Sequence, residues 1–188
     1  PLKSALVGQN TQVASGEKAI IEAGEREVDL LMAAIVGPAG LLPTVAAIRK
    51  GTTVALANKE CLVSSGEILI KELDKSKAKL LPVDSEHNAI FQVFENHNKS
   101  HLDRLILTAS GGPFRDCSLE EMKEKSPKEA LAHPNWNMGN KISIDSATMM
   151  NKGLEIIEAH YLFGVKESVI DVVIHPQSIV HSLVSYLD

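Results

Sequence analysis

Short apolar runs alternate with amphipathic stretches along the first 80 residues of the chain. Helical spacing of the apolar positions predicts helices over residues 11–22, 41–50 and 59–73. Compact apolar runs of strand length predict strands over residues 29–36 and 52–57. Strands and helices that alternate in this way are typical of a parallel sheet with crossover helices. We therefore expect this region to be half of a doubly wound nucleotide-binding domain.

A polar, lysine-rich stretch at residues 71–79 interrupts the pattern, and we place a domain boundary after it, between residues 1–80 and 81–188. The second region is expected to contain, in order, helix 85–95, strand 102–109, helix 147–163, strand 169–174 and strand 178–186. Gly164 would end the long helix, because glycine is favoured just past a helix C-terminus. The chain opens in mid-pattern without an initiator Met, so we expect an internal part of a longer protein.

The composition indicates an ordinary globular protein, with 44% hydrophobic and 23% charged residues. A net charge of -5 and a pI near 5.8 provide no basic field, which argues against a nucleic-acid partner. No stretch approaches the roughly 20 apolar residues that a membrane helix requires, so no membrane partner is expected. Cys61 and Cys117 lie far apart without companion spacing, and we expect two reduced thiols.

The run from Asp145 to Glu155 contains the densest candidate chemistry. Backbone N–H groups at a helix start are unpaired and lie at the positive end of the helix dipole, where they favour an anion. The side chains that could hold a phosphate there are Ser146, Thr148, Asn151 and Lys152. Glu155 would lie one helical turn further along the same face. The pattern indicates a phosphorylated substrate, bound at one end and transformed at the other.

Asp84, Ser85 and Glu86 lie where a strand gives way to a helix. Helix capping by Asp84 or Ser85 is the commoner explanation of such a tripeptide. If Glu155 folds beside Asp84 and Glu86, carboxylates ~4 Å apart repel by about 4 kcal/mol per pair at an effective dielectric of 20, and the cluster then implies a cation. All-oxygen ligands suit Mg²⁺ or Mn²⁺ better than zinc.

Two loops offer further candidates. Ser110, in a strand-end Gly-Gly loop, is either an ordinary turn residue or a hydrogen-bond donor to a phosphate. Residues 133–139 have the composition of a loop, although His133, Trp136 and Met138 could equally be structural or core residues. A closing lid would explain apolar groups on a loop, and it would place the imidazole near the anion.

Asn58, Lys59 and Glu60 follow the second predicted strand, where a doubly wound sheet meets its ligands. The alternative is a solvated lysine in a first helical turn, with a glutamate that favours the helix dipole. The segment 175–178 and His181 are interpreted as structural.

Taken together, six ordered motifs make the chain closely resemble the 1-deoxy-D-xylulose 5-phosphate reductoisomerase family. The motifs are Leu56–Glu60, Pro82–Gln92, Ser110–Arg115, His133–Gly139, Ile144–Glu155 and His175–Ser178. The similarity covers essentially the whole chain. That family converts 1-deoxy-D-xylulose 5-phosphate to 2-C-methyl-D-erythritol 4-phosphate in non-mevalonate isoprenoid synthesis, by a rearrangement followed by reduction with NADPH.

The resemblance implies an α/β fold, in which residues 1–80 are the second half of a doubly wound NADPH-binding domain and residues 81–188 are the α/β catalytic domain. It implies that Mg²⁺ or Mn²⁺ is held by Asp84, Glu86 and Glu155. The implied substrate contacts are Lys59, Ser85, Glu86, Ser110, His133, Ser146, Asn151, Lys152 and Glu155. The implied catalytic residues among them are Lys59, Glu86, His133 and Glu155. NADPH contacts are implied for Asn58, Glu60 and Gly139, and a flexible flap for Trp136 and Met138.

The chain departs from the family pattern in two respects, since it lacks the glycine-rich loop of the NADPH domain and the helical C-terminal region. Two other functions therefore stay open at this point: a metal-dependent phosphosugar isomerase or aldolase without nicotinamide, and a non-catalytic phosphate-binding fragment. For the full-length protein the resemblance implies a homodimer, in the cytoplasm of a bacterium or the stroma of a plastid.

Overall fold

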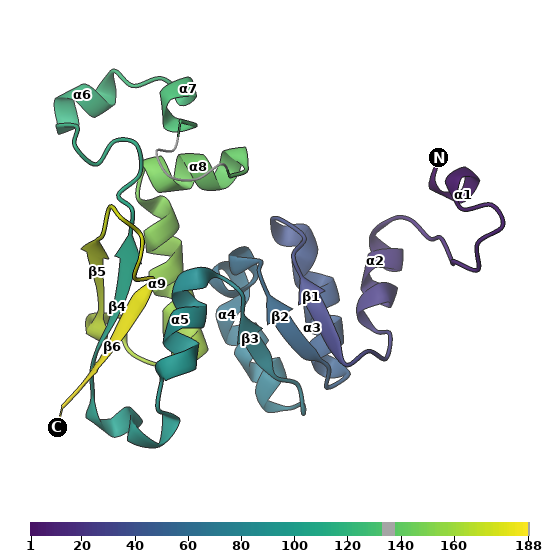
Figure 1. The fold of residues 1–188 in the computed structure, drawn as a ribbon. Helices are drawn as coiled ribbons and strands as arrows, with labels where there is room; N and C mark the ends of the chain where they lie inside the picture. The colour runs from purple at the N-terminus through teal and green to yellow at the C-terminus, as the bar shows by residue number, and fades with distance from the viewer. Residues whose placement is uncertain (133–137, 188) are drawn as a thin grey trace.

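The computed structural model describes residues 1–132 and 138–187, and within these residues two three-stranded sheets lie side by side (Figure 1). The first sheet contains β1 (Leu30–Ala33), β2 (Thr53–Leu56) and β3 (Leu80–Pro82), in that order. All of its pairings are parallel. The crossover helices are α3 (Leu41–Arg49) and α4 (Lys59–Asp74). The alternating pattern predicted this parallel α/β arrangement, and the structure confirms it.

The core of the first unit lies between this sheet and its helices. Its fully buried side chains include Ile48, Val54, Leu56, Leu62 and Leu69. Each such side chain stabilises the folded state by about 1.5–3 kcal/mol relative to an exposed position. The strand Leu80–Pro82 pairs with β2, so it belongs to this first sheet.

Several predicted boundaries at the N-terminal end were wrong. The helix expected at residues 11–22 is α2 (Glu17–Gly24), and a short α1 (Leu2–Ala5) precedes it. Gly16, with a φ of 90°, separates α2 from the non-helical residues 11–15. The expected strand 29–36 is limited to β1, which matches the four residues of β2 with which it pairs.

The second unit is built on a mixed sheet with the order β5-β4-β6. Its strands are β4 (Leu102–Ala109), β5 (Ile170–Ile174) and β6 (Ser182–Tyr186). β5 runs parallel to β4, and β6 runs antiparallel to it. Two helices, α5 (Ser85–Val93) and α9 (Met150–Phe163), lie between the two sheets (Figure 1). Short 3-10 turns at Asn96–His101 and Glu167–Val169 connect these elements.

The two units are joined by close packing between α4 and α9. A methyl group on Gly66 of α4 would lie 2.3 Å from the ring of Tyr161 of α9. Glycine is therefore required for the two helices to approach this closely. The position of α9 matters because this helix carries Asn151, Lys152 and Glu155.

The expected single helix over residues 147–163 was wrong, because two helices meet at this point. α8 (Asn140–Ala147) ends before Thr148, and α9 begins at Met150. Met149 between them has a left-handed backbone conformation, with a φ of 60°. Gly164 ends α9, as predicted, and it has a left-handed backbone conformation.

Between β4 and α8 lie two short helices, α6 (Leu119–Lys123) and α7 (Pro127–Ala130), each of which begins with a capping box. Both cysteines are free thiols, and Cys61 is buried. Among the described residues, no helix combines the length and apolar character needed to cross a bilayer.

Candidate metal and anion site

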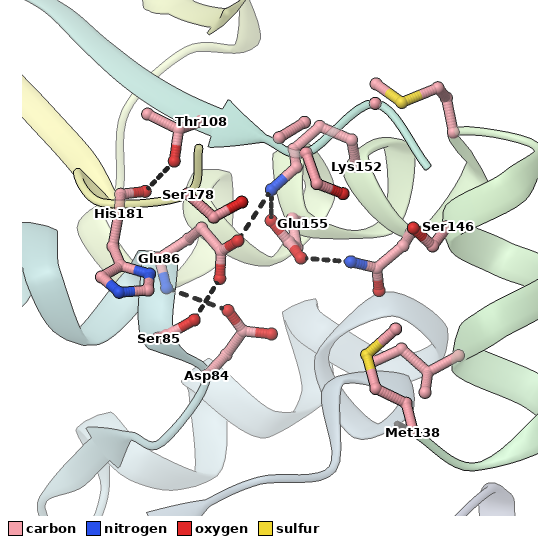
Figure 2. A pocket seen from close by; sticks show the side chains of 16 residues that line it. Asp84, Ser85, Glu86, Thr108, Met138, Ser146, Lys152, Glu155, Ser178 and His181 are labelled. Carbon is pink, nitrogen blue, oxygen red and sulfur yellow. Dashed lines mark hydrogen bonds and ion pairs between the residues drawn. The ribbon is translucent and has the colours of Figure 1, made fainter. Parts of the chain in front are cut away.

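A cavity with a volume of about 460 Å³ is lined by described residues between Asp84 and His181, all outside the first sheet and its crossover helices (Figure 2). This volume falls within the range of small-molecule sites. Its walls are the start of α5, the end of β4, the α8–α9 junction and the loop before β6. The polar and charged residues of its lining are Asp84, Ser85, Glu86, Thr108, Ser110, Ser146, Asn151, Lys152, Glu155, Ser178 and His181.

Three carboxylates converge in this cavity. Asp84, Glu86 and Glu155 each offer an oxygen, and these oxygens lie within 4.8 Å of one another. Asp84 also caps α5, since the backbone N–H of Glu86 donates to its Oδ1 at 3.2 Å. Asp84 therefore both caps the helix and belongs to the carboxylate cluster, so the two interpretations of this segment are compatible. An all-oxygen set of this kind fits Mg²⁺ or Mn²⁺.

Two buried lysines lie against the carboxylates. Lys59 Nζ donates to Asp84 Oδ2 at 2.7 Å and to Glu155 Oε1 at 3.2 Å. Lys152 Nζ donates to Glu86 Oε1 at 3.3 Å and to Glu155 Oε2. These ammonium groups offset much of the repulsion that the three carboxylates would otherwise experience. Because they bind the same three carboxylates, a divalent cation at this position would compete with them.

The pKa values of this cluster reflect burial and neighbouring charge. Burial disfavours the charged form of Asp84, but His87 and Lys59 outweigh it and hold the pKa of Asp84 well below its usual range. Burial and the negative charge of Glu155 raise the pKa of Glu86. Burial disfavours the charged form of Lys59 as well, yet the surrounding carboxylates raise its pKa above the ordinary value. Lys59 is therefore a cation at neutral pH.

Behind the carboxylates lies a second layer, which the sequence analysis missed. The imidazole of His87 is fully buried, and its Nε2 lies 2.9 Å from the carbonyl oxygen of Glu155. Its Nδ1 lies 3.3 Å from Glu158 Oε2 and 3.5 Å from Asp84 Oδ1. Burial raises the pKa of Glu158 to about 7. Helical spacing could have pointed to Glu158, which follows Glu155 by one turn on the same helix.

The predicted phosphate-binding residues also meet in the cavity, with one exception. Ser110, Ser146, Asn151 and Lys152 all line it. Thr148 does not, because its hydroxyl donates to the carbonyl of Ile144, 3.0 Å away at the end of α8. The expectation for Thr148 was wrong because it assumed that the residue lay at a helix start.

The Gly-Gly loop after Ser110 packs tightly on α8. A methyl group on Gly112 would lie 2.5 Å from the carbonyl oxygen of Ser146, and Gly112 has a φ of 67°. Only glycine adopts this conformation easily and leaves room for the contact. The loop thus holds Ser110 and Ser146 in one wall of the cavity.

Two of the residues expected to contact NADPH, Asn58 and Glu60, lie just past the carboxyl end of β2. Asn58 caps α4, and its amide donates to the carbonyl oxygens of Ile35 and Gly37. Glu60 forms an ion pair with Lys141 of α8 at 2.9 Å. Gly139 is the residue before α8. Of the expected flap, Met138 lines the cavity, whereas His133 and Trp136 lie outside the described residues.

Three lining residues, Thr108, Ser178 and His181, were not expected to take part in the site. The segment 175–178 and His181 had been interpreted as structural. Their proximity to the carboxylates depends on the pairing of β5 and β6 with β4, which has no local signal in the sequence.

The fold and the site define an α/β protein in which half of a doubly wound parallel sheet adjoins a carboxylate–lysine cavity. Two family models, both of 1-deoxy-D-xylulose 5-phosphate reductoisomerase, match the chain. One matches residues 1–66, and the model of the C-terminal domain matches residues 80–163. The chain belongs to the 1-deoxy-D-xylulose 5-phosphate reductoisomerase family.

The relatives support this assignment over the whole chain. The 1-deoxy-D-xylulose 5-phosphate reductoisomerase of Rhodospirillum centenum is 60% identical over 187 residues, which are 100% of this chain and 46% of the relative. The solved reductoisomerase from Zymomonas mobilis, in complex with NADPH, is 55% identical with a TM-score of 0.92, over 99% of this chain and 48% of that one. A solved complex with NADPH, fosmidomycin and magnesium is 52% identical with a TM-score of 0.91, covering 98% and 48%. The chain spans about half the length of the curated relatives it matches.

Proposed function

We propose that this chain provides the metal- and substrate-binding centre of an enzyme that converts 1-deoxy-D-xylulose 5-phosphate to 2-C-methyl-D-erythritol 4-phosphate with NADPH. The observation that carries the proposal is the convergence of Asp84 and Glu86 with Glu155 in the same cavity as Asn151 and Lys152. A cation site and an anion site in one cavity suit a substrate that has a phosphate and neighbouring oxygen atoms.

The two regions of the chain have different binding roles. Residues 1–80 form part of the NADPH-binding domain, and residues 81–188 bind metal and substrate. Asn58, Glu60 and Gly139 border the cofactor. Support comes from the location of Asn58 and Glu60 just past the carboxyl end of β2, which is where doubly wound sheets bind ligands. The relative from Zymomonas mobilis was solved with NADPH.

The metal is held by Asp84, Glu86 and Glu155, and it is Mg²⁺ or Mn²⁺. The oxygen-only ligand set supports this choice. When bound, such an ion supplies Lewis-acid polarisation of a carbonyl oxygen and a template for neighbouring oxygens. NADPH supplies the hydride for the reduction.

The other residues of the cavity orient the substrate. Lys152 and Asn151, together with Ser110 and Ser146, bind the phosphate, and a fixed phosphate restricts the substrate to reactive orientations. Ser85 and Glu86 contact its polar oxygens, and Lys59 contacts it from the cofactor side. His133, Trp136 and Met138 cover the bound ligand and exclude water. Met138 already lines the cavity.

The partner of the site is a small phosphorylated sugar, and neither a nucleic acid nor a membrane is involved. The full-length protein is a homodimer. Relatives of the chain include the bacterial enzymes of Rhodospirillum centenum and Zymomonas mobilis, which supports the bacterial cytoplasm over a plastid.

A spectrophotometric assay tests the function. The full-length protein that contains this chain is incubated with Mn²⁺, NADPH and 1-deoxy-D-xylulose 5-phosphate, and the loss of reduced nicotinamide absorbance is followed. We expect sustained turnover, which Glu155→Gln abolishes. Glu124→Gln, an exposed change of the same type, serves as the control and should leave the rate unchanged. Turnover that is absent in the unmodified protein, or that persists in Glu155→Gln, contradicts the proposal.

A further inference from the structure

The loop from His175 to His181, between β5 and β6, closes one side of the cavity. It brings Ser178 and His181 into the cavity wall. In Figure 2 both side chains lie on the side of the cavity next to Thr108, away from Ser146. Ser178 has a φ of 51°, a left-handed conformation that is uncommon for a residue with a side chain. Such a conformation persists only where its surroundings hold it in place.

The imidazole of His175 holds the loop from within. Its Nε2 accepts hydrogen bonds from the backbone N–H groups of Ile179 at 3.0 Å and Val180 at 3.1 Å. Its own carbonyl oxygen accepts the N–H of Ser178 at 3.0 Å. An imidazole nitrogen accepts a hydrogen bond only through its lone pair, so His175 Nε2 is an acceptor and not a donor in this arrangement. One side chain thus satisfies two consecutive backbone donors immediately after the strained residue.

Strand β4 holds the same loop from outside. The Thr108 hydroxyl lies 2.8 Å from the carbonyl oxygen of Val180 and 2.6 Å from that of His181, and these two acceptors share its single proton. The backbone N–H of His175 donates to the carbonyl oxygen of Ala109 at 2.7 Å. The loop is therefore attached to β4 just before Ser110, which lies in the same cavity wall.

We propose that His175 is a positioning residue for substrate binding, which acts by folding the loop so that Ser178 and His181 face the substrate. Thr108 has the same role from the side of the sheet. This inference rests on the proposed function and extends it from the phosphate and metal contacts to a third wall of the cavity. Neither His175 nor Thr108 belongs to the carboxylate cluster, so both act on substrate binding and not on metal binding.

The test compares His175→Leu, which removes the acceptor, with His175→Gln, which keeps an acceptor at a similar distance from the backbone. Two properties of the full-length protein are measured: hydrogen exchange of the Ile179 and Val180 amides, and KM for 1-deoxy-D-xylulose 5-phosphate. In His175→Leu we expect the exchange rate of the two amides and KM each to rise about tenfold. A change of this size corresponds to the loss of about one or two net hydrogen bonds. His175→Gln should stay close to the unmodified protein in both properties, and Mn²⁺ affinity should be unchanged in all variants.

Thr108→Val keeps the shape of the side chain without its hydroxyl, and it serves as a second variant if His175→Leu does not fold. It should also raise KM without changing Mn²⁺ affinity. Unchanged exchange in His175→Leu overturns the proposal, as does faster exchange without a change in KM. An equal rise in exchange rate and KM in His175→Leu and His175→Gln would also overturn the proposal. An unmodified protein without turnover overturns the proposed function itself, and the exchange data then show separately whether His175 holds the loop.

Discussion

Replacing Glu158 by Gln should make the metal-free protein more stable at alkaline pH, although it alters a buried charged cluster. Glu158 is 1% exposed and lies beside the imidazole of His87. Burial raises the pKa of its carboxyl from 4.5 to about 7. Gln has nearly the same shape and carries no charge, so the substitution mimics the protonated acid.

The magnitude follows from the linkage between protonation and folding. A carboxyl whose pKa is higher in the folded state contributes stability that is fully present below pH 4.5 and is lost as the pH rises through 7. With 1.36 kcal/mol for each pKa unit, ionised Glu158 costs the folded state about 3 kcal/mol at pH 8. Most of that cost is absent at pH 5. The stabilisation by Gln relative to Glu should therefore be greater at pH 8 than at pH 5 by about 2–3 kcal/mol.

Urea unfolding followed by circular dichroism in the presence of EDTA measures this difference. The unmodified protein, Glu158→Gln and the exposed control Glu124→Gln are compared at pH 5 and pH 8. Groups that do not interact with Glu158 contribute equally to each variant and cancel at each pH, whereas the coupled titration of His87, which lies 3.3 Å from Glu158, is part of the measured difference. If Glu158→Gln gives the same change in the free energy of unfolding at both pH values, the carboxyl is ionised throughout and the reasoning is refuted.

Two further substitutions test the site and the packing beneath it. Lys152→Met should raise KM for the phosphorylated substrate about 10–100-fold in steady-state assays, because a charge-assisted contact to the phosphate is lost; an unchanged KM would exclude Lys152 from phosphate binding. Gly66→Ala should destabilise the protein by about 1–3 kcal/mol in thermal unfolding, because its methyl group overlaps the ring of Tyr161. Gly153→Ala in α9 is the matched control, since its nearest atom is 3.9 Å away, and it should stabilise by about 0.5–1 kcal/mol; equal effects at both glycines would contradict the packing argument.

The parallel first sheet could be predicted because its strands and helices differ in the period of their apolar residues. The break between α8 and α9 could not, since Thr148 and Met149 include neither Gly nor Pro. Met149 adopts its left-handed conformation only in the context of the two helices. Tertiary packing overrides local preference at this position, and the same error misplaced Thr148.

The geometry of the candidate site also depends on tertiary packing that local sequence patterns do not reveal. The residue types of Asp84, Glu86 and Glu155 indicate oxygen ligands, but their convergence depends on how α9 packs against α4 and β4. Local sequence patterns carry no information on that packing. The convergence of the three carboxylates was predicted from the family resemblance instead. His87 and Glu158 were missed because their relation depends on two helices that are far apart in sequence. Ser178 and His181 were missed because a loop that joins two strands has no helical or strand period to place it.

Calorimetric titration of Mn²⁺ into the metal-free full-length protein measures directly whether Asp84, Glu86 and Glu155 bind one ion. We expect one ion per chain, and an affinity that falls by at least about tenfold in Glu155→Gln, as expected when a metal ligand or its support is removed. Glu124→Gln should bind as the unmodified protein does. Undiminished affinity in Glu155→Gln, or no binding to the unmodified protein, would contradict the assignment of Asp84, Glu86 and Glu155 as one metal site.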